Sequence, residues 1–183
     1  LEYIQPCLDA ILARTDYSAF EIIIIDHDSD DPDVRDYLVS ISENNPEKIQ
    51  LLRWTGEFNY SAMINSAVEK SAGDYILLMH NDTLVIQDQW LNRMMNLCQR
   101  DDVDIVGARL LSPGDGKIQH AGYVMGKSSI VDSTYVNSIH VNDMGFQGSA
   151  QIIREVTAVS SACMLVSKSI FKTIGGMDRI NFP

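Results

Sequence analysis

The stretch Gly73-Asp74-Tyr75-Ile76-Leu77-Leu78-Met79-His80-Asn81-Asp82-Thr83 decides the fold, because a buried apolar run ends there in a polar cluster. Residues 76–79 have the length and unbroken apolarity of a strand covered on both faces. Asp82 is then expected just past the strand's carboxyl end, where open α/β sheets bind ligands. Its carboxylate could hold a divalent cation, which could in turn hold phosphates. The alternative is a turn over residues 81–83 that needs no ligand, and this stretch alone favours neither.

The composition is that of a globular chain of 183 residues with an acidic balance. With 45% hydrophobic and 21% charged residues, the chain is expected to form one domain with one core. The net charge of −11 repels polyanions, so nucleic acid and anionic membranes are not expected partners. A nucleotide is still allowed, because one metal ion can offset the local repulsion. No run approaches the roughly 18 apolar residues that span a bilayer, and no signal peptide opens the chain, which favours a cytoplasmic protein.

The three cysteines are odd in number and far apart, and they form no Cys-x-x-Cys pair. This pattern disfavours both a disulfide framework and a zinc site. Buried free thiols in a reducing compartment are therefore predicted for Cys7, Cys98 and Cys163.

Helical and strand patterns alternate through the first 111 residues, which indicates a layered α/β fold with a mostly parallel central sheet. Strands are predicted over residues 20–25, 49–54, 76–79 and 103–111, and helices over residues 3–12, 33–41, 61–71 and after the cap Asp88. Residues 112–149 are rich in Gly, Ser, Asn and Asp, so they are expected to be mostly loop, with a short extended element over 117–122. A strand over 156–166 and a helix capped by Ser167 follow.

A second predicted strand, residues 20–25, also ends in acids, Asp26 and Asp28. Parallel strands end at the same edge of a sheet, so both acids are expected near Asp82. The alternative is a solvated acidic turn before a helix that begins at Pro32. His27 and His80 each stand within an acid cluster, where a histidine gains charge or becomes a metal ligand.

Three further side chains are candidates with ordinary alternatives. Asn59 and Asn65 lie with Ser61 on the helix before the central strand, where the alternative is an N-cap with a surface amide. That alternative fits Asn65 less well, because Asn65 follows Ser61 by four residues on the same helix face. His120 lies in the predicted loop, where a lone histidine is more often a surface residue. Neither Gly-x-Gly-x-x-Gly nor Gly-x-x-x-x-Gly-Lys occurs, which disfavours a Rossmann dehydrogenase and a phosphate-loop hydrolase.

With these residues in place, the chain resembles the family 2 glycosyltransferases of the GT-A fold over essentially its whole length. Residues 20–29, Phe-Glu-Ile-Ile-Ile-Ile-Asp-His-Asp-Ser, are similar to the segment that embraces the base and ribose of a nucleotide sugar, with His27 where Asp or Asn is usual. Residues 72–83 are similar to the strand that leads to the family's Asp-x-Asp motif. His80 replaces the first aspartate of that motif, and Asp82 matches the last, which ligates Mn²⁺ or Mg²⁺ against the diphosphate.

The second half is similar to transferases that build bacterial surface polysaccharide, such as O-antigen or rhamnose transferases. Residues 115–122, Asp-Gly-Lys-Ile-Gln-His-Ala-Gly, and residues 154–166 have counterparts there. Gly175-Gly176-Met177-Asp178 matches the acceptor-side segment that precedes the family's Glu-Asp pair, so the catalytic base is expected beyond Pro183. The family's first strand is also expected to lie outside this chain. The resemblance implies a single, incomplete GT-A domain over 1–183, with a nucleotide-sugar half over 1–111 and an acceptor-side half over 112–183.

The resemblance implies an inverting transfer of a sugar from a nucleotide-diphosphate donor to a polysaccharide or lipid-linked acceptor. The full-length protein would then work in the cytoplasm or as a peripheral protein at the cytoplasmic face of the membrane. Residues 126–149 are expected to touch the acceptor. The residue roles implied are nucleotide binding by Asp26, His27, Asp28, Asn59, Asn65 and Asn81, metal binding by His80 and Asp82, and an acceptor-side position for His120 and Asp178.

Two rival functions remain open. One is a binding module or inactive remnant that holds a nucleotide sugar without turning it over. The other is a phosphatase of the haloacid dehalogenase type, because Asn81-Asp82-Thr83-Leu84 follows a strand. Its chemistry needs an aspartate nucleophile at the position of His80, which disfavours it.

Overall fold

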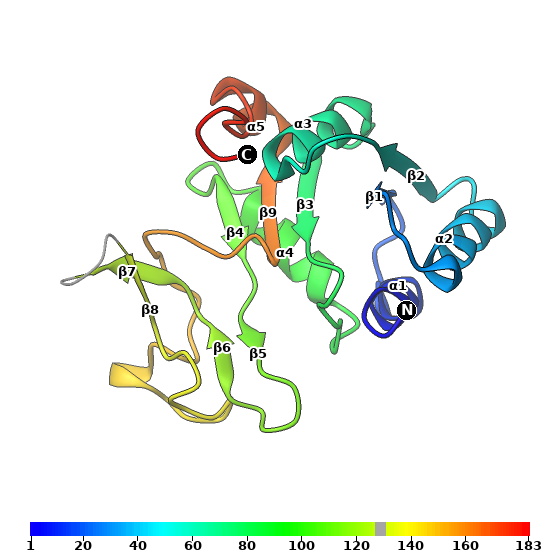
Figure 1. The fold of residues 1–183 in the computed structure, drawn as a ribbon. Coiled ribbons are helices and arrows are strands. Elements are labelled where there is room, and N and C mark those ends of the chain that lie inside the picture. The colour runs from blue at the N-terminus through cyan, green and yellow to red at the C-terminus, as the bar shows by residue number, and fades with distance from the viewer. Residues whose placement is uncertain (127–130) are drawn as a thin grey trace.

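The computed structural model describes residues 1–126 and 131–183 and shows an α/β fold (Figure 1). The first part of the chain alternates as predicted: α1 (Ile4–Arg14), β1 (Ile22–His27), α2 (Pro32–Asn44), β2 (Ile49–Trp54), α3 (Tyr60–Lys70), β3 (Tyr75–Met79), α4 (Trp90–Cys98) and β4 (Ile105–Gly107). The second part contains β5 (Leu110–Leu111), β6 (Ile118–His120), β7 (Tyr123–Met125), β8 (Val131–Ser133), the 3₁₀ turn η1 (Phe146–Gly148), β9 (Cys163–Ser167) and α5 (Lys168–Thr173).

The described strands form separate sheets, of which β1 with β2 is parallel and β3, β9 and β4 make an antiparallel one. β1 and β2 pair in parallel, in register from Ile22 opposite Ile49 to His27 opposite Trp54. β9 lies between β3 and β4 and is antiparallel to both, so β3 and β4 run in the same direction. The late strand β9 therefore fills the centre of a three-stranded unit built otherwise from the first half of the chain.

Helices cover both faces of the unit that contains β3 and β9, which makes three layers and confirms the predicted layered α/β fold. Alternate residues of a strand point to opposite faces. Ile76 and Leu78 of β3 pack in one cluster with residues of α3 and α5, while Leu77 packs against the α4 cluster on the other face. A third cluster joins α1 and α2 to β1 and β2 through residues such as Leu8 and Ile24.

Local sequence explains where several helices begin. The side chain of Asp31 accepts a hydrogen bond from the Asp33 N–H ahead of α2, which has Pro32 in its first turn. Ser167 caps α5 through the Ile170 N–H, as predicted. Asp88 does not cap α4, because Gln89 occupies the N-cap position without a side-chain hydrogen bond. The carboxylate of Asp88 instead pairs with Arg14 at 3.5 Å.

The second half contains more regular structure than its composition predicts. The expected strand over 103–111 is interrupted and forms β4 and β5, and the strand expected over 156–166 lies later, at Cys163–Ser167. The extended element expected over 117–122 contains β6, which pairs with β5 just before the expected loop. Within the expected loop, β7 also pairs with β8. In Figure 1, β5 to β8 and η1 lie to one side of the central strands, and β9 and α5 return to them.

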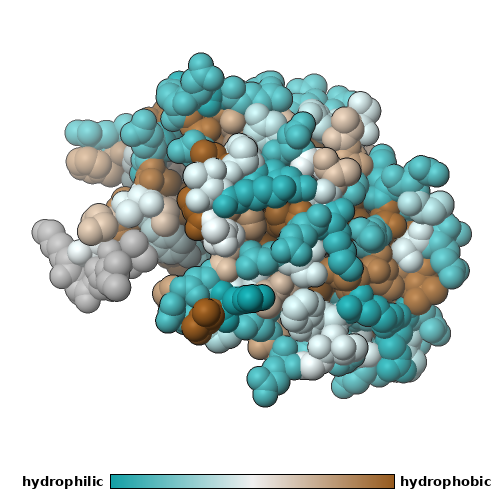
Figure 2. All heavy atoms as spheres, turned by 90° about the horizontal axis from the view of Figure 1, so that it is seen from above, coloured by the Kyte–Doolittle hydropathy of each residue, from teal (hydrophilic) through white to brown (hydrophobic). Residues whose placement is uncertain are grey.

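One face of the molecule is mainly hydrophilic. The face seen in Figure 2 carries mainly hydrophilic side chains with hydrophobic ones scattered among them. Cys7, Cys98 and Cys163 are free and buried, as predicted. Among the described residues, no helix has the length and apolarity needed to cross a bilayer.

Candidate functional site

The turn after β3 is held by hydrogen bonds to the residues that lead into β9. The His80 N–H donates to the Ala162 carbonyl at 3.1 Å, and the Thr83 hydroxyl donates to the same oxygen at 3.1 Å. His80 Nε2 lies 3.3 Å from the Ser161 hydroxyl. The turn is closed by the Thr83 N–H, which donates to the His80 carbonyl at 3.1 Å. Its backbone is therefore fixed before any ligand arrives.

Asn81 and Asp82 project from this fixed turn into solvent. Both are exposed, and neither side chain makes a hydrogen bond or ion pair with the described part of the chain. The charge of Asp82 nevertheless acts on its surroundings: burial raises the pKa of the Cys7 thiol to about 11, with Asp82 as the second cause. The Cys7 thiol also points to the His80 carbonyl at 3.8 Å, so α1 packs beneath the turn. Asp82 thus presents a free carboxylate on a rigid support.

The end of β1 differs because its first acid is already engaged. β1 continues through His27, so Asp26 lies inside the strand, opposite Arg53 of β2, rather than past the strand end as expected. Arg53 Nη1 donates to Asp26 Oδ2 at 2.6 Å. The Ser29 N–H and hydroxyl donate to Oδ1 at 3.3 and 2.5 Å. Asp26 is only 2% exposed, so it organises the strand end from within.

His27 and Asp28 remain at the surface of this strand end. His27 Nε2 lies 2.9 Å from the Gly56 carbonyl oxygen, and its ring lies 5.6 Å from the Phe58 ring. Because a carbonyl oxygen only accepts, Nε2 carries the proton in this contact. Asp28 is exposed and has a positive φ of 46°, a conformation that turns the chain sharply after the strand.

Residues 56–60, which we call the bridging segment, reach both strand ends. Gly56 and Phe58 contact His27, and two residues later the Tyr60 ring meets the His80 ring edge-on at 6.5 Å. Phe58 is 61% exposed, an unusual position for a phenylalanine ring. Sequence reasoning missed these aromatic residues. The available clue was Phe58-Asn59-Tyr60, two aromatic residues on either side of the residue that caps α3.

Asn59 and Asn65 bind the backbone near the carboxyl end of the chain. Asn59 Oδ1 caps α3 through the Ala62 N–H at 2.7 Å, and its Nδ2 donates to the Arg179 carbonyl at 3.0 Å. Asn65 both donates to the Met177 carbonyl at 2.8 Å and accepts from the Met177 N–H at 2.9 Å. These amides fix the segment after α5 and have protein partners where a nucleotide contact was expected.

Ser61 and Gly176 complete this attachment. The buried Ser61 hydroxyl donates to the Phe182 carbonyl. Gly176 has a φ of +75°, and a Cβ there would lie 2.6 Å from Asn65 Oδ1, so only glycine allows the close approach.

His120 is a buried structural acceptor, which corrects the expectation of a surface loop residue. It is 4% exposed, and its Nε2 accepts from the Gly122 N–H at 3.3 Å and the Ser160 N–H at 3.1 Å. Burial lowers its pKa, consistent with an unprotonated Nε2. Because Ser160 precedes Ser161, His120 supports the segment that contacts His80.

Asp178 forms a local turn. Its carboxylate accepts from the Asn181 side-chain amide at 2.6 Å and from the N–H groups of Ile180 and Asn181 at 3.0 Å each. The Asn181 side chain is the main cause of a lowered pKa at Asp178. The remaining acceptor-side prediction, residues 126–149, includes 127–130, which lie outside the described residues.

The donor set after β3 fits a hard divalent cation that shares its coordination with phosphates. No group of three or more His, Cys, Asp or Glu side chains able to hold a metal ion occurs in residues 1–126 and 131–183. Mg²⁺ commonly uses only one or two carboxylates and takes its other ligands from substrate phosphates and water. One free carboxylate, Asp82, with His80 two positions earlier, meets that requirement.

The chain matches the profile of glycosyl transferase family 2 over residues 1–175. It is 34% identical over 180 residues to an uncharacterized protein, y4gI, of Sinorhizobium fredii, covering 98% of this chain and 19% of that protein. It is 28% identical over 178 residues to the O-antigen biosynthesis protein RfbC of Myxococcus xanthus, covering 97% of this chain and 14% of that protein. The chain therefore spans less than a fifth of these relatives.

Two solved structures show a similar fold. The first is the mannosyltransferase PcManGT of Pyrobaculum calidifontis in complex with GDP-Man and Mn²⁺, with a TM-score of 0.67, 13% identity, and coverage of 98% of this chain and 44% of that one. The second is residues 1–349 of TarS of S. aureus, with a TM-score of 0.53, 16% identity, and coverage of 95% and 45%. At these identities the likeness concerns the fold.

Proposed function

Because the chain belongs to glycosyl transferase family 2, we propose that it forms the donor site of an enzyme that transfers a sugar from a nucleotide-diphospho-sugar. The acceptor we propose is a carbohydrate or lipid-linked carbohydrate of bacterial surface polysaccharide, in keeping with the O-antigen biosynthesis relative. The three free cysteines favour a reducing, cytoplasmic site for the reaction. Residues 1–111 are the proposed donor half and residues 112–183 the proposed acceptor side.

The observation that carries this proposal is the free Asp82 carboxylate on the fixed turn after β3. Asp82, with His80 two positions earlier in the same turn, would hold Mn²⁺ or Mg²⁺, which when bound supplies positive charge for the departing diphosphate. One protein of similar fold, the mannosyltransferase PcManGT, was solved in complex with both GDP-Man and Mn²⁺. The proposed role of the exposed Asn81 amide is to donate to a phosphate or ribose oxygen.

The end of β1 and the bridging segment are the proposed nucleoside contacts. His27 donates Nε2–H to Gly56, so in its neutral form Nδ1 is an acceptor for an N–H group of the base. The exposed Phe58 ring offers an apolar face, and the Asp28 carboxylate offers an acceptor for a ribose hydroxyl. Asp26, Asn59 and Asn65 position these elements through their own hydrogen bonds.

We propose that the transfer inverts the anomeric carbon, because a carboxylate base that deprotonates the acceptor hydroxyl allows in-line attack opposite the diphosphate. We assign no residue of this chain to that base. His120 and Asp178 contribute on the acceptor side by holding the segments around Ser160 and Asn181.

Calorimetric titration of UDP, GDP and dTDP, with and without Mn²⁺, tests the donor site. We expect one nucleotide to bind with Mn²⁺ and the Asp82→Asn variant to lose at least about tenfold in affinity, or about 1.4 kcal/mol. Asp101→Asn is the matched control, because Asp101 is also exposed and its side chain contacts no partner in the described part of the chain, but it lies in the turn after α4. Absence of Mn²⁺-dependent binding for all three nucleotides would refute the proposal.

A second measurement separates the enzyme from a binding module. The nucleotide sugar that corresponds to the preferred nucleotide is incubated with the chain and Mn²⁺, and released sugar is measured. Slow release that depends on Asp82 supports an enzyme. Tight binding with no release and no transfer would reassign the chain as a module that holds nucleotide sugars.

A further inference from the structure

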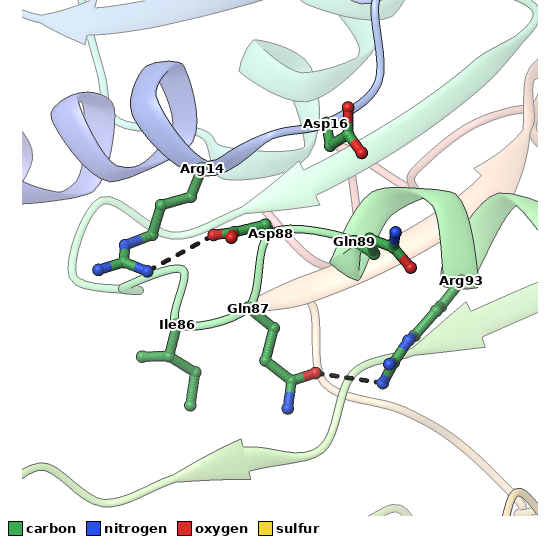
Figure 3. A pocket seen from close by; sticks show the side chains of 7 residues that line it. All are labelled: Arg14, Asp16, Ile86, Gln87, Asp88, Gln89 and Arg93. Atoms are coloured by element: carbon green, nitrogen blue, oxygen red, sulfur yellow. Dashed lines mark hydrogen bonds and ion pairs between the residues drawn. The ribbon is translucent and has the colours of Figure 1, made fainter.

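A surface pocket lies at the carboxyl end of α1, which ends at Arg14 (Figure 3). It has a volume of about 580 Å³ and is lined by Arg14, Asp16, Ile86, Gln87, Asp88, Gln89 and Arg93. Cys7 of α1 contacts the His80 carbonyl, and Arg14 lies two turns further along the same helix. At 1.5 Å per residue, the pocket begins roughly 10 Å along the helix from the proposed metal turn.

The backbone around the pocket is tied together by hydrogen bonds between its two walls. The Asp16 N–H donates to the Asp88 carbonyl at 3.1 Å. The Trp90 indole N–H donates to the Thr15 hydroxyl at 3.1 Å, and the Asn92 amide donates to the Asp16 carbonyl at 2.7 Å. These contacts join the loop after α1 to the start of α4, so the backbone on which the lining side chains stand is fixed, while the side chains themselves are exposed.

The polar side chains on this frame are weakly engaged and available to a ligand. Arg14 and Asp88 are 3.5 Å apart with side-chain exposures of 52% and 72%, which makes their pairing worth little. Arg93 Nη1 lies 3.4 Å from Gln87 Oε1, a long contact. In Figure 3 the two arginines lie on either side of the loop 86–89.

Two lining groups have no partner at all within the described residues. The Asp16 carboxylate and the Gln89 amide are exposed, and only their backbone groups make hydrogen bonds. Ile86 adds an apolar side chain that is 60% exposed. The pocket therefore combines free donors, free acceptors and one apolar contact.

The charges of the pocket cancel, in contrast to the net charge of −11 of the chain. Its arginines, Arg14 and Arg93, are balanced by the aspartates Asp16 and Asp88, so a polyanion gains nothing here and a cation gains little. A sugar hydroxyl can donate one hydrogen bond and accept others, so it suits guanidinium and amide donors as well as amide and carboxylate acceptors. The C–H face of a sugar ring can also pack against Ile86.

From these observations we infer that this pocket binds a neutral oligosaccharide, as a subsite for a part of the acceptor remote from the transfer point. The inference rests on the proposed function, because it assigns the ligand to the acceptor of the same reaction. The subsite lies within residues 1–111, so it adds an acceptor contact outside the acceptor side proposed over residues 112–183. The pocket favours acceptors with several neutral sugars over charged ones.

Nuclear magnetic resonance titration of the chain tests this subsite. The signals observed are the Trp90 indole N–H and the Gln87 and Gln89 side-chain amides, and the probes are neutral trisaccharides of rhamnose, mannose, galactose and glucose, with trigalacturonic acid as the anionic comparison. We expect at least one neutral trisaccharide to shift these signals in a saturable manner. We expect trigalacturonic acid to bind at least fivefold more weakly.

Variants locate the effect within the pocket. Gln89→Ala and Arg93→Gln should each weaken trisaccharide binding at least fivefold. The controls Gln99→Ala and Arg100→Gln carry the same changes at the other end of α4 and should bind as the unmutated chain does. Mn²⁺-dependent nucleotide binding should be unchanged in all four variants.

The outcomes distinguish this inference from the proposed function. If no neutral trisaccharide shifts the three signals, if the anionic sugar binds as tightly, or if the pocket variants bind unchanged, the subsite is refuted while nucleotide binding can still stand. If the unmutated chain does not bind nucleotides, the proposed function is refuted instead, whatever the result of the trisaccharide titration.

Discussion

The ends of β1 and β3 carry similar residues but use them differently. At β1, Asp26 is buried and already accepts hydrogen bonds from Arg53 and Ser29. At β3, Asp82 is exposed and its carboxylate has no partner within the described residues. The difference comes from the neighbouring strand, because the register of β1 and β2 places Arg53 directly opposite Asp26. An acid at a strand end is therefore available to a ligand only when no cation stands across from it.

Among the variants that test this comparison, the largest loss of stability is expected when the cation beside Asp26 is removed. Arg53→Ala should destabilise the chain by about 3 kcal/mol, because it leaves a buried carboxylate without its ion-pair partner. Asp26→Asn should cost less, about 1.5 kcal/mol, because Arg53 is half-exposed and can be hydrated alone. Urea unfolding of both variants measures the two costs. Equal costs, or a smaller cost for Arg53→Ala, would contradict the assigned role of the pair.

A smaller loss of stability is expected when His120 is replaced. This residue lies in the second half of the chain and supports the segment that contacts the end of β3. His120→Phe should cost about 2 kcal/mol, because the Gly122 and Ser160 N–H groups lose their buried acceptor. His140→Phe, a change at an exposed histidine, is the control. Unfolding free energies at pH 7 measure both variants, and a cost for the control that matches that of His120→Phe would contradict the assigned hydrogen bonds.

His120 also predicts a dependence of stability on pH. Burial lowers its pKa below the ordinary value of 6.5, so the unfolded chain binds a proton where the folded chain does not. The free energy of unfolding should therefore fall as the pH drops from 7 through 6.5 toward the folded pKa. His120→Phe should lose this part of the dependence, measured by urea unfolding at pH 7 and pH 5.5. An unchanged pH dependence in the variant would show that other groups cause it.

The smallest effect on stability is expected at Asp82 itself. Asp82→Asn should change the free energy of unfolding by less than about 0.5 kcal/mol, because the side chain is exposed and unpaired within the described residues. The same variant is expected to lose Mn²⁺-dependent nucleotide binding. Thermal unfolding beside the calorimetric titration measures both effects. A large loss of stability would show that Asp82, like Asp26, serves the fold.

Much of the first half could be predicted because its elements follow local patterns. The apolar runs before Asp26 and His80 predicted β1 and β3, and helical spacing predicted α1 to α4. The second half could not be predicted in the same way. The short extended element predicted over 117–122 contains β6 (Ile118–His120), but β7 and β8 have three residues each, too short for a periodic pattern.

The candidate site was predicted in its residues more than in its contacts. Asp82 lies where the strand pattern places it, but nothing local to Asp26 shows that Arg53 lies opposite. The role of the bridging segment was not predicted, because it depends on the contacts of Phe58 with His27 and of Tyr60 with His80, which only the structure shows. Likewise, the partners of Asn65 lie 112 residues later in the chain, beyond the reach of any local pattern.

The central position of β9 has a consequence for how the chain folds during synthesis. β3 and β4 each pair with β9, which follows both of them late in the sequence, with Met79 opposite Cys163. Until β9 leaves the ribosome, the edges of β3 and β4 that it will join are unpaired and open to association with other chains. Long-range pairing of this kind also slows folding. The β3 turn that carries Asp82 can therefore reach its final shape only once β9 has been made.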